Sequence, residues 1–221
     1  MTGFDHHDHH HRRLLRHVPT GCRTALDVGC GTGRSARRLA DRGIAVDAMD
    51  AMDRSEAVIR AARAAGTRPG SRFHHRDLAV AGPPGEGYDF ISCPASLHHM
   101  LFATLTVLRD ALAPGGVLAV LGCHRDASAV DRMCSLAAVP VNAAARLAVA
   151  GRAALPGRRG GPVGPAGGAG PPPGTVTAPV VEPRMTMEEI RREAADLLPA
   201  FTLRRLLFWR HLLLHRTPTE H

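Results

Sequence analysis

Three glycines spaced two residues apart, Gly29, Gly31 and Gly33, are the part of the sequence best suited to hold a ligand. They follow an apolar run over residues 24–28 and precede a helix-like stretch that begins at Arg34. A strand, a tight glycine turn and a helix in this order let backbone N–H groups approach a bound ligand closely. Glycine suits the turn because a side chain would block that approach or forbid the backbone angles. The segment therefore predicts a binding site for a nucleotide-like cofactor.

The spacing of the glycines argues against a dinucleotide. The dinucleotide fingerprint G-x-G-x-x-G has a third glycine that lets the helix pack tightly on the strand. Counted from Gly29, that position is Arg34, and a long charged side chain fits poorly there. The chain instead reads D-x-G-x-G-x-G from Asp27 to Gly33. These residues alone leave open a nucleotide site of another kind or a purely structural turn.

Two aspartates compete for the role of a ribose ligand. An acidic residue about 20 residues past such a turn accepts hydrogen bonds from a ribose diol. The tandem Ala48-Met49-Asp50-Ala51-Met52-Asp53 supplies both Asp50, at the expected spacing, and Asp53, which opens Asp53-Arg54-Ser55. The spacing slightly favours Asp50, and the other aspartate would then cap the next helix.

Three further blocks follow the glycine turn in order. The first is Arg76-Asp77-Leu78, the second runs from Tyr88-Asp89-Phe90 through Cys93 to Leu97-His98-His99, and the third is Leu112-Ala113-Pro114-Gly115-Gly116-Val117-Leu118. Together with the glycine turn, which resembles motif I of the class I S-adenosylmethionine-dependent methyltransferases, these blocks resemble that family over about residues 24–122. The resemblance implies a Rossmann-like, seven-stranded, mostly parallel α/β sheet with helices on both faces and an antiparallel C-terminal strand.

The resemblance also implies a cofactor, S-adenosylmethionine, and a set of residues that hold it. Asp77 is similar to the family's adenine ligand. The cofactor-binding set that we expect consists of Asp27, Gly29, Cys30, Gly31, Gly33, Asp50, Asp53, Asp77, Leu78 and Cys93. His98 and His99 are candidate general bases, because an unperturbed imidazole has a pKa of about 6.5. A role for both histidines in packing or helix capping is equally compatible with the sequence.

The acceptor of the methyl group is less defined. The segment Cys93-Pro94-Ala95-Ser96 lacks the N/D-P-P-aromatic pattern of enzymes that methylate base or amide nitrogens, which favours a small-molecule acceptor. The N-terminal histidine-rich segment and the final Phe208-Trp209-Arg210-His211 resemble a small-molecule-type bacterial branch. A non-catalytic S-adenosylmethionine-binding regulatory protein and an RNA methyltransferase stay open as alternatives.

Composition narrows the class of partner. The formal net charge is +8, all basic residues are arginine, and aromatic residues make up only 4%. Nucleic-acid surfaces usually mix Lys and Arg and add aromatic side chains, so nucleic-acid binding is not the favoured interpretation. Five cysteines form no C-x-x-C pair, and their odd number argues against a disulfide framework and favours a reducing compartment. No bound metal is expected. No apolar run reaches about 20 residues, and no signal-peptide core is evident at the N-terminus, so we expect a cytoplasmic protein without a membrane span.

Alternating apolar runs and amphipathic stretches predict a largely parallel sheet in a single domain over residues 1–221. We expect strands at residues 24–28, 44–49, 72–75, 88–93 and 117–121, then an antiparallel pair at 201–206 and 208–215. Helices are expected at residues 34–42, 55–65, 102–112 and 186–198, the last opened by a capping box at Thr186. Residues 1–20 are expected to form an N-terminal lid or helical extension, and residues 151–174 a flexible insertion rich in Gly and Pro.

Overall fold

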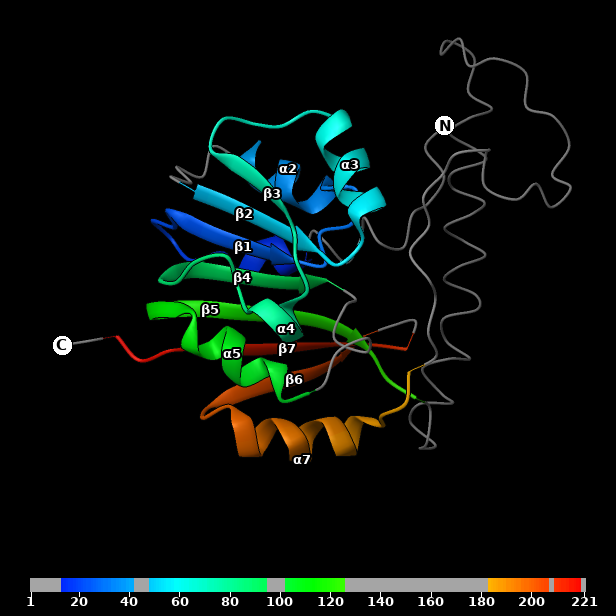
Figure 1. Ribbon diagram of the computed structural model, residues 1–221. Coiled ribbons are helices and arrows are strands. Elements are labelled where there is room, and N and C mark those ends of the chain that lie inside the picture. The colour runs from blue at the N-terminus through cyan, green and yellow to red at the C-terminus, as the bar shows by residue number, and fades with distance from the viewer. Residues whose placement is uncertain (1–12, 42–47, 95–101, 126–182, 207–208, 220–221) are drawn as a thin grey trace, which may run out of the picture.

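A seven-stranded sheet with helices on both faces forms the core of the protein in a computed structural model, which describes residues 13–41, 48–94, 102–125, 183–206 and 209–219 (Figure 1). The strands stand in the order β3-β2-β1-β4-β5-β7-β6. Their bounds are β1 Thr24–Val28, β2 Ala48–Asp53, β3 Ser71–His75, β4 Tyr88–Pro94, β5 Leu112–Cys123, β6 Phe201–Leu206 and β7 Arg210–Arg216. Strands β1 to β5 pair in parallel, whereas β7 runs antiparallel between β5 and β6. The predicted Rossmann-like sheet is confirmed.

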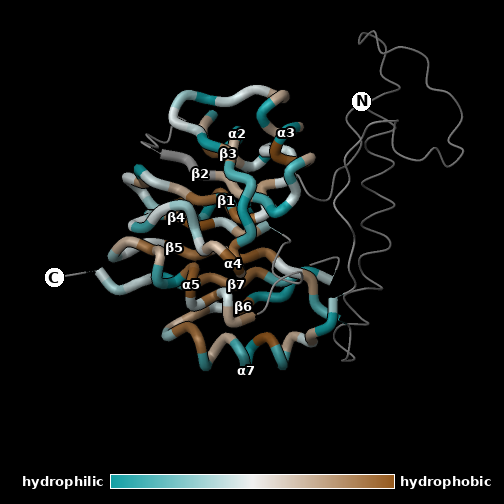
Figure 2. The backbone as a smooth tube through the Cα atoms, in the orientation of Figure 1, coloured by the Kyte–Doolittle hydropathy of each residue, from teal (hydrophilic) through white to brown (hydrophobic). Residues whose placement is uncertain are grey.

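The helices cover both faces of this sheet. They are the 3-10 helix η1 Leu15–His17, α2 Arg34–Ala40, α3 Glu56–Ala64, α4 Leu78–Ala81, α5 Thr104–Asp110 and α7 Met187–Leu197. Buried side chains of η1, α2 and α3 form one apolar cluster, and those of α5 and α7 form a second on the other face. The central strands are apolar on both faces for this reason. Brown, hydrophobic segments accordingly run through the middle of the sheet in Figure 2.

The predicted capping box forms at the start of helix α7. The Thr186 hydroxyl accepts a hydrogen bond from the Glu189 N–H at 3.2 Å, and the Glu189 carboxylate accepts one from the Thr186 N–H at 2.8 Å. Met187, Ile190 and Ala194 form the buried stripe of the helix, at the spacing that an amphipathic helix requires. The backbone leaves the helical region at Leu198, directly before the proline that was expected to end it.

Two predicted strand boundaries were wrong, and one short helix was not predicted. Strand β2 runs to Asp53 rather than ending at Met49, and residues 44–47 of the predicted strand lie outside the described part of the chain. Strand β5 begins at Leu112 and includes the Pro-Gly-Gly segment predicted as a turn, because the pairing of Tyr88 with Leu112 continues past a register shift. The short helix α4 forms where no helix was expected. The insertion at 151–174 and most of the N-terminal extension lie outside the described residues, so those predictions stay predictions.

Candidate functional site

The glycine turn lies at the carboxyl end of β1 and is tied to the end of β2. Gly29, Gly31 and Gly33 have φ values of 69°, 54° and 75°, all in the left-handed region that favours glycine. The N–H groups of Gly29 and Cys30 both donate to the carbonyl of Met52, at 2.8 Å and 3.0 Å. The turn is therefore held by backbone bonds to the neighbouring strand.

Two of the glycines face different surroundings. A Cβ added at Gly33 would lie 2.6 Å from the Phe73 ring of β3, so this glycine is required for packing. A Cβ added at Gly31 would meet no atom within 4 Å. Gly31 thus faces open space, and a ligand can approach the backbone there.

Asp53 adjoins the turn, whereas Asp50 lies within β2. The Asp53 carboxylate accepts hydrogen bonds from the Gly31 N–H at 3.3 Å and the Ser55 N–H at 2.8 Å. It is partly exposed at the carboxyl end of its strand. The backbone of Asp50 is in register with Leu26, well before that end. The register thus favours Asp53 over Asp50 as the residue that can reach a ligand at the glycine turn, contrary to the spacing argument.

Asp27 is the fully buried acidic residue beneath the turn. Its side chain is 0% exposed, and Oδ1 accepts a 2.7 Å hydrogen bond from the Ser92 hydroxyl. Oδ2 has no hydrogen-bond partner. Burial raises the pKa of Asp27 to about 7, the Ser92 hydrogen bond lowers it, and the charge of Asp53 raises it further. An unpaired buried carboxylate oxygen is costly, so the site fits a ligand that brings a donor or a positive charge.

The two cysteines predicted to contact the cofactor are both buried, but they lie in different parts of the fold. Cys30 sits inside the turn, where burial raises the pKa of its thiol far above the ordinary value. A thiol held neutral in this way is a poor nucleophile. Cys93 is 0% exposed on β4 and packs in the apolar cluster on the side of α5 and α7. Cys30 is thus suited to line a site rather than to react.

Asp77 and Leu78 begin the short helix α4, two residues after β3. The Asp77 carboxylate accepts from the Ala79 N–H at 2.9 Å, and its side chain is exposed. Leu78 is buried, 4% exposed, against the second apolar cluster. Because β2 and β3 are parallel, the segment after β3 lies at the same edge of the sheet as Asp53. The two candidate catalytic residues, His98 and His99, fall outside the described residues.

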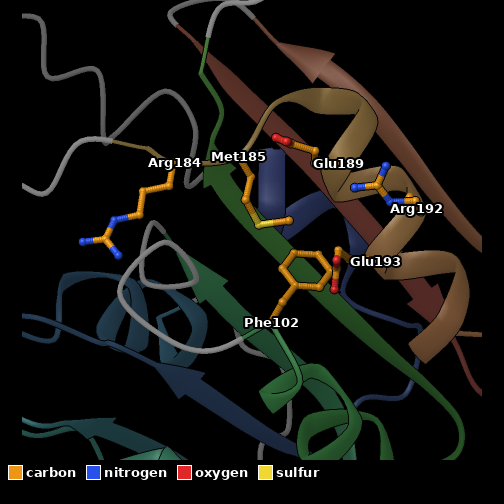
Figure 3. A pocket seen from close by; sticks show the side chains of 6 residues that line it. All are labelled: Phe102, Arg184, Met185, Glu189, Arg192 and Glu193. Carbon is orange, nitrogen blue, oxygen red and sulfur yellow. The ribbon is translucent and has the colours of Figure 1, made fainter.

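A pocket of about 350 Å³ adjoins this edge of the sheet between the start of α7 and the segment after β4. It is lined by Phe102, Arg184, Met185, Glu189, Arg192 and Glu193, shown in Figure 3. The Arg125 N–H, just past β5, donates to the Met185 carbonyl at 2.7 Å, which fixes the pocket beside the carboxyl end of β5. The sequence does not predict this pocket, because the capping box indicates α7 but no sequence signal joins that helix to β5.

Among the described residues, no group of three or more His, Cys, Asp or Glu side chains is arranged to hold a metal ion. In that same part of the chain, no helix has the length and apolar character needed to cross a membrane.

Comparison with known proteins agrees with this geometry. Residues 25–116 match the family described as "Methyltransferase domain". The chain is 36% identical over 115 residues to an uncharacterized methyltransferase of Mycobacterium tuberculosis, covering 51% of this chain and 57% of that protein. It is also 36% identical over 115 residues to a trans-aconitate 2-methyltransferase of Variovorax paradoxus, covering 49% of this chain and 42% of that protein. The chain thus spans about half the length of these curated relatives.

Solved structures share the fold over nearly the whole chain. A putative methyltransferase of Haloferax volcanii, in complex with the Trm112 activator, aligns with a TM-score of 0.61 at 15% identity, covering 96% of this chain and 90% of that one. DhpI in complex with SAH aligns with a TM-score of 0.58 at 16% identity, covering 97% and 86%. At these identities the likeness shows the fold alone.

Proposed function

We propose that this chain, which has the fold of the class I S-adenosylmethionine-dependent methyltransferases and matches the methyltransferase-domain family over residues 25–116, transfers a methyl group from S-adenosylmethionine to a small-molecule acceptor. The observation that carries the proposal is the buried Asp27 carboxylate under the glycine turn, with one oxygen unpaired. A cofactor that carries an ammonium group supplies the positive charge this oxygen lacks.

The other parts of the cofactor match residues around the same edge of the sheet. In this proposal Asp53, which lies beside the open Gly31, accepts hydrogen bonds from the ribose hydroxyls. Asp77, whose carboxylate is exposed after β3, accepts a hydrogen bond from the adenine amino group. We carry the predicted contacts of Gly29, Cys30, Gly33, Leu78 and Cys93 forward as part of the same proposal, with Asp53 in preference to Asp50.

When bound, the cofactor supplies the reactive group, a methyl group on a positively charged sulfur. The sulfur keeps the electron pair of the broken bond as the methyl group leaves. The protein contributes binding and orientation. Much of the rate of such a displacement can come from holding the two reactants close and aligned. The chain's own residues therefore need to bind the cofactor, exclude water and present an acceptor at the adjoining pocket.

Two observations support a small acceptor. The pocket lined by Phe102 and the start of α7 has a volume of about 350 Å³, which suits a compact molecule. The trans-aconitate 2-methyltransferases among the relatives act, by their names, on a small molecule.

Calorimetry with S-adenosylhomocysteine, the demethylated cofactor, tests the proposal directly. We expect binding in the micromolar range, and an Asp77→Ala variant that binds at least tenfold more weakly. Asp110→Ala is the matched control, because Asp110 is an exposed aspartate ion-paired with Arg109 on α5, away from the glycine turn. No heat with the wild-type protein, or equal binding by both variants, would contradict the proposal.

A further inference from the structure

The pocket between Phe102 and the first half of α7 has a charge pattern that points to one class of acceptor. We propose that it binds an acceptor whose carboxylate group receives the methyl group, and that the guanidinium groups of Arg184 and Arg192 attract this acid. This inference rests on the proposed methyltransferase function and goes beyond it, because it names the chemical class of the acceptor and the residues that select it.

The carboxylate of Glu189 already takes part in the N-terminal cap of α7. Its carboxylate accepts the Thr186 N–H of the capping box at 2.8 Å. That hydrogen bond and the nearby charges of Arg125 and Arg192 lower the pKa of Glu189. Glu189 therefore stays ionised as part of the helix cap, and it is poorly available to a cationic ligand.

The described lining has two guanidinium groups, Arg184 and Arg192, and two carboxylates, Glu189 and Glu193. Because Glu189 belongs to the helix cap, the two arginines face one further carboxylate, that of Glu193. Among the described residues, neither Arg184 nor Arg192 makes a hydrogen bond or an ion pair with another side chain. The pocket also adjoins the N-terminal turn of α7, where the helix dipole favours negative charge. A carboxylate is the group that these donors bind most specifically.

The two arginines stand on either side of an apolar wall. Figure 3 shows Arg184 and Arg192 on opposite sides of the Phe102 ring and the Met185 thioether. Such a wall suits the hydrocarbon body of a small organic acid, with the acid group reaching a guanidinium. Glu193, beside the Phe102 ring in the same view, opposes an anion and so restricts where the acid group can lie.

A carboxylate acceptor also needs no general base. Among the described residues, the pocket lining has no His, Cys or Tyr side chain, and its two carboxylates are those of Glu189, which caps α7, and Glu193. An alcohol must lose a proton as it attacks a methyl group, which calls for a general base. A carboxylate is already an anion at neutral pH, so binding and alignment suffice.

Three molecules of nearly equal shape and different charge test the inference: phenylacetate, phenylacetamide and phenethylamine. Each is titrated into the protein saturated with S-adenosylhomocysteine. We expect phenylacetate to bind at least tenfold more tightly than the neutral amide, and phenethylamine to bind most weakly. Fumarate serves as a second anion without an aromatic ring. Tighter binding of phenethylamine than of either anion would overturn the proposal.

Variants identify the residues responsible. Arg192→Gln and Arg184→Gln should each weaken phenylacetate binding about tenfold, because each removes one of the two positive charges that attract the acid group. Arg191→Gln is the matched control, since Arg191 lies next to Arg192 on α7 but does not line the pocket. Glu193→Gln should tighten the binding of the anions, because it removes a repelling charge. Equal effects of the Arg191 and Arg192 changes, or weaker anion binding by Glu193→Gln, would contradict the assignment.

The product provides a second readout. Methyl esters release methanol in base, whereas N-methyl and S-methyl products do not. Base-labile methyl groups formed on organic acids support the inference, and only base-stable products would overturn it. Failure to bind S-adenosylhomocysteine would instead refute the methyltransferase function itself, so the two failures are distinguishable.

Discussion

The hydroxyl of Ser92 on β4 donates a 2.7 Å hydrogen bond to the buried Oδ1 of Asp27 on β1, directly across the parallel pairing of the two strands. This is the one hydrogen bond to the Asp27 carboxylate that the described residues provide, because Oδ2 has none. The bond partly offsets burial, which still raises the pKa of Asp27 to about 7. An aspartate that titrates near neutral pH makes both stability and ligand binding depend on pH.

We predict that stability falls as pH rises toward neutrality. The pKa of Asp27 is raised from 3.8 in the unfolded chain to about 7 in the folded protein. The folded state therefore binds the extra proton between these values, and the stabilisation is present at low pH and lost as pH rises through 7. The full effect is on the order of 4 kcal/mol. Urea unfolding of wild type and Asp27→Asn from pH 4.5 to 8 should show a smaller downward slope for the variant, and equal slopes would contradict this account.

Binding of the cofactor should release a proton in the same pH range. A ligand ammonium next to Asp27 favours the ionised carboxylate, so at about pH 6 the protonated aspartate must lose its proton on binding. Calorimetry of S-adenosylhomocysteine in two buffers with different ionisation enthalpies measures that proton directly. Asp27→Asn should bind more weakly and release none. If Asp27→Asn releases as many protons as the wild type, the released proton does not come from Asp27.

The choice between Asp53 and Asp50 leads to a direct comparison. Asp53 accepts from the Gly31 N–H at the end of β2, whereas Asp50 is in register with Leu26 inside the sheet. We expect Asp53→Asn to weaken S-adenosylhomocysteine binding at least tenfold, the size of a lost charge-assisted hydrogen bond. Asp50→Asn should change it less than threefold. The reverse order would restore the prediction made from spacing.

The sequence predicted the sheet well because its strands are short apolar runs separated by amphipathic helices. Its errors have local causes. The tandem Ala48-Met49-Asp50-Ala51-Met52-Asp53 offers two equivalent strand ends, and only the pairing of Val28 with Met52 selects the second. Pro114 and the glycines after it read as a turn, yet the chain stays in the sheet through an irregular pairing with Tyr88.

The glycine-turn region of the candidate site could be predicted from the sequence, whereas the pocket beside α7 could not. The glycine turn and Asp77 follow the carboxyl ends of strands. The alternation of strands and helices predicts a parallel sheet, which brings those ends to one edge. The Ser92 contact needs the register of β1 against β4, which the hydrophobic pattern of either strand does not fix. The pocket joins residues near 102, 125 and 185, which are far apart in the sequence. Such a site follows only from the folded arrangement.

Alanine substitutions at glycines of the turn can distinguish a loss of stability from a loss of cofactor binding. Gly21, Gly31 and Gly33 all have positive φ, so an alanine at any of them costs about 1 kcal/mol in backbone strain. At Gly33 the added Cβ would also lie 2.6 Å from the buried Phe73 ring, and such overpacking costs roughly 1–3 kcal/mol more. At Gly21 and Gly31 the added Cβ meets no atom within 4 Å.

We therefore expect Gly33→Ala to lower the free energy of unfolding clearly more than Gly31→Ala, and Gly31→Ala to match Gly21→Ala. Calorimetry should then show that Gly31→Ala loses S-adenosylhomocysteine binding while Gly21→Ala keeps it, because the methyl group at Gly31 fills the space that the ligand needs. Denaturant unfolding gives the stability of all three variants under one set of conditions. Wild-type affinity in Gly31→Ala would show that the ligand does not approach the turn at that residue.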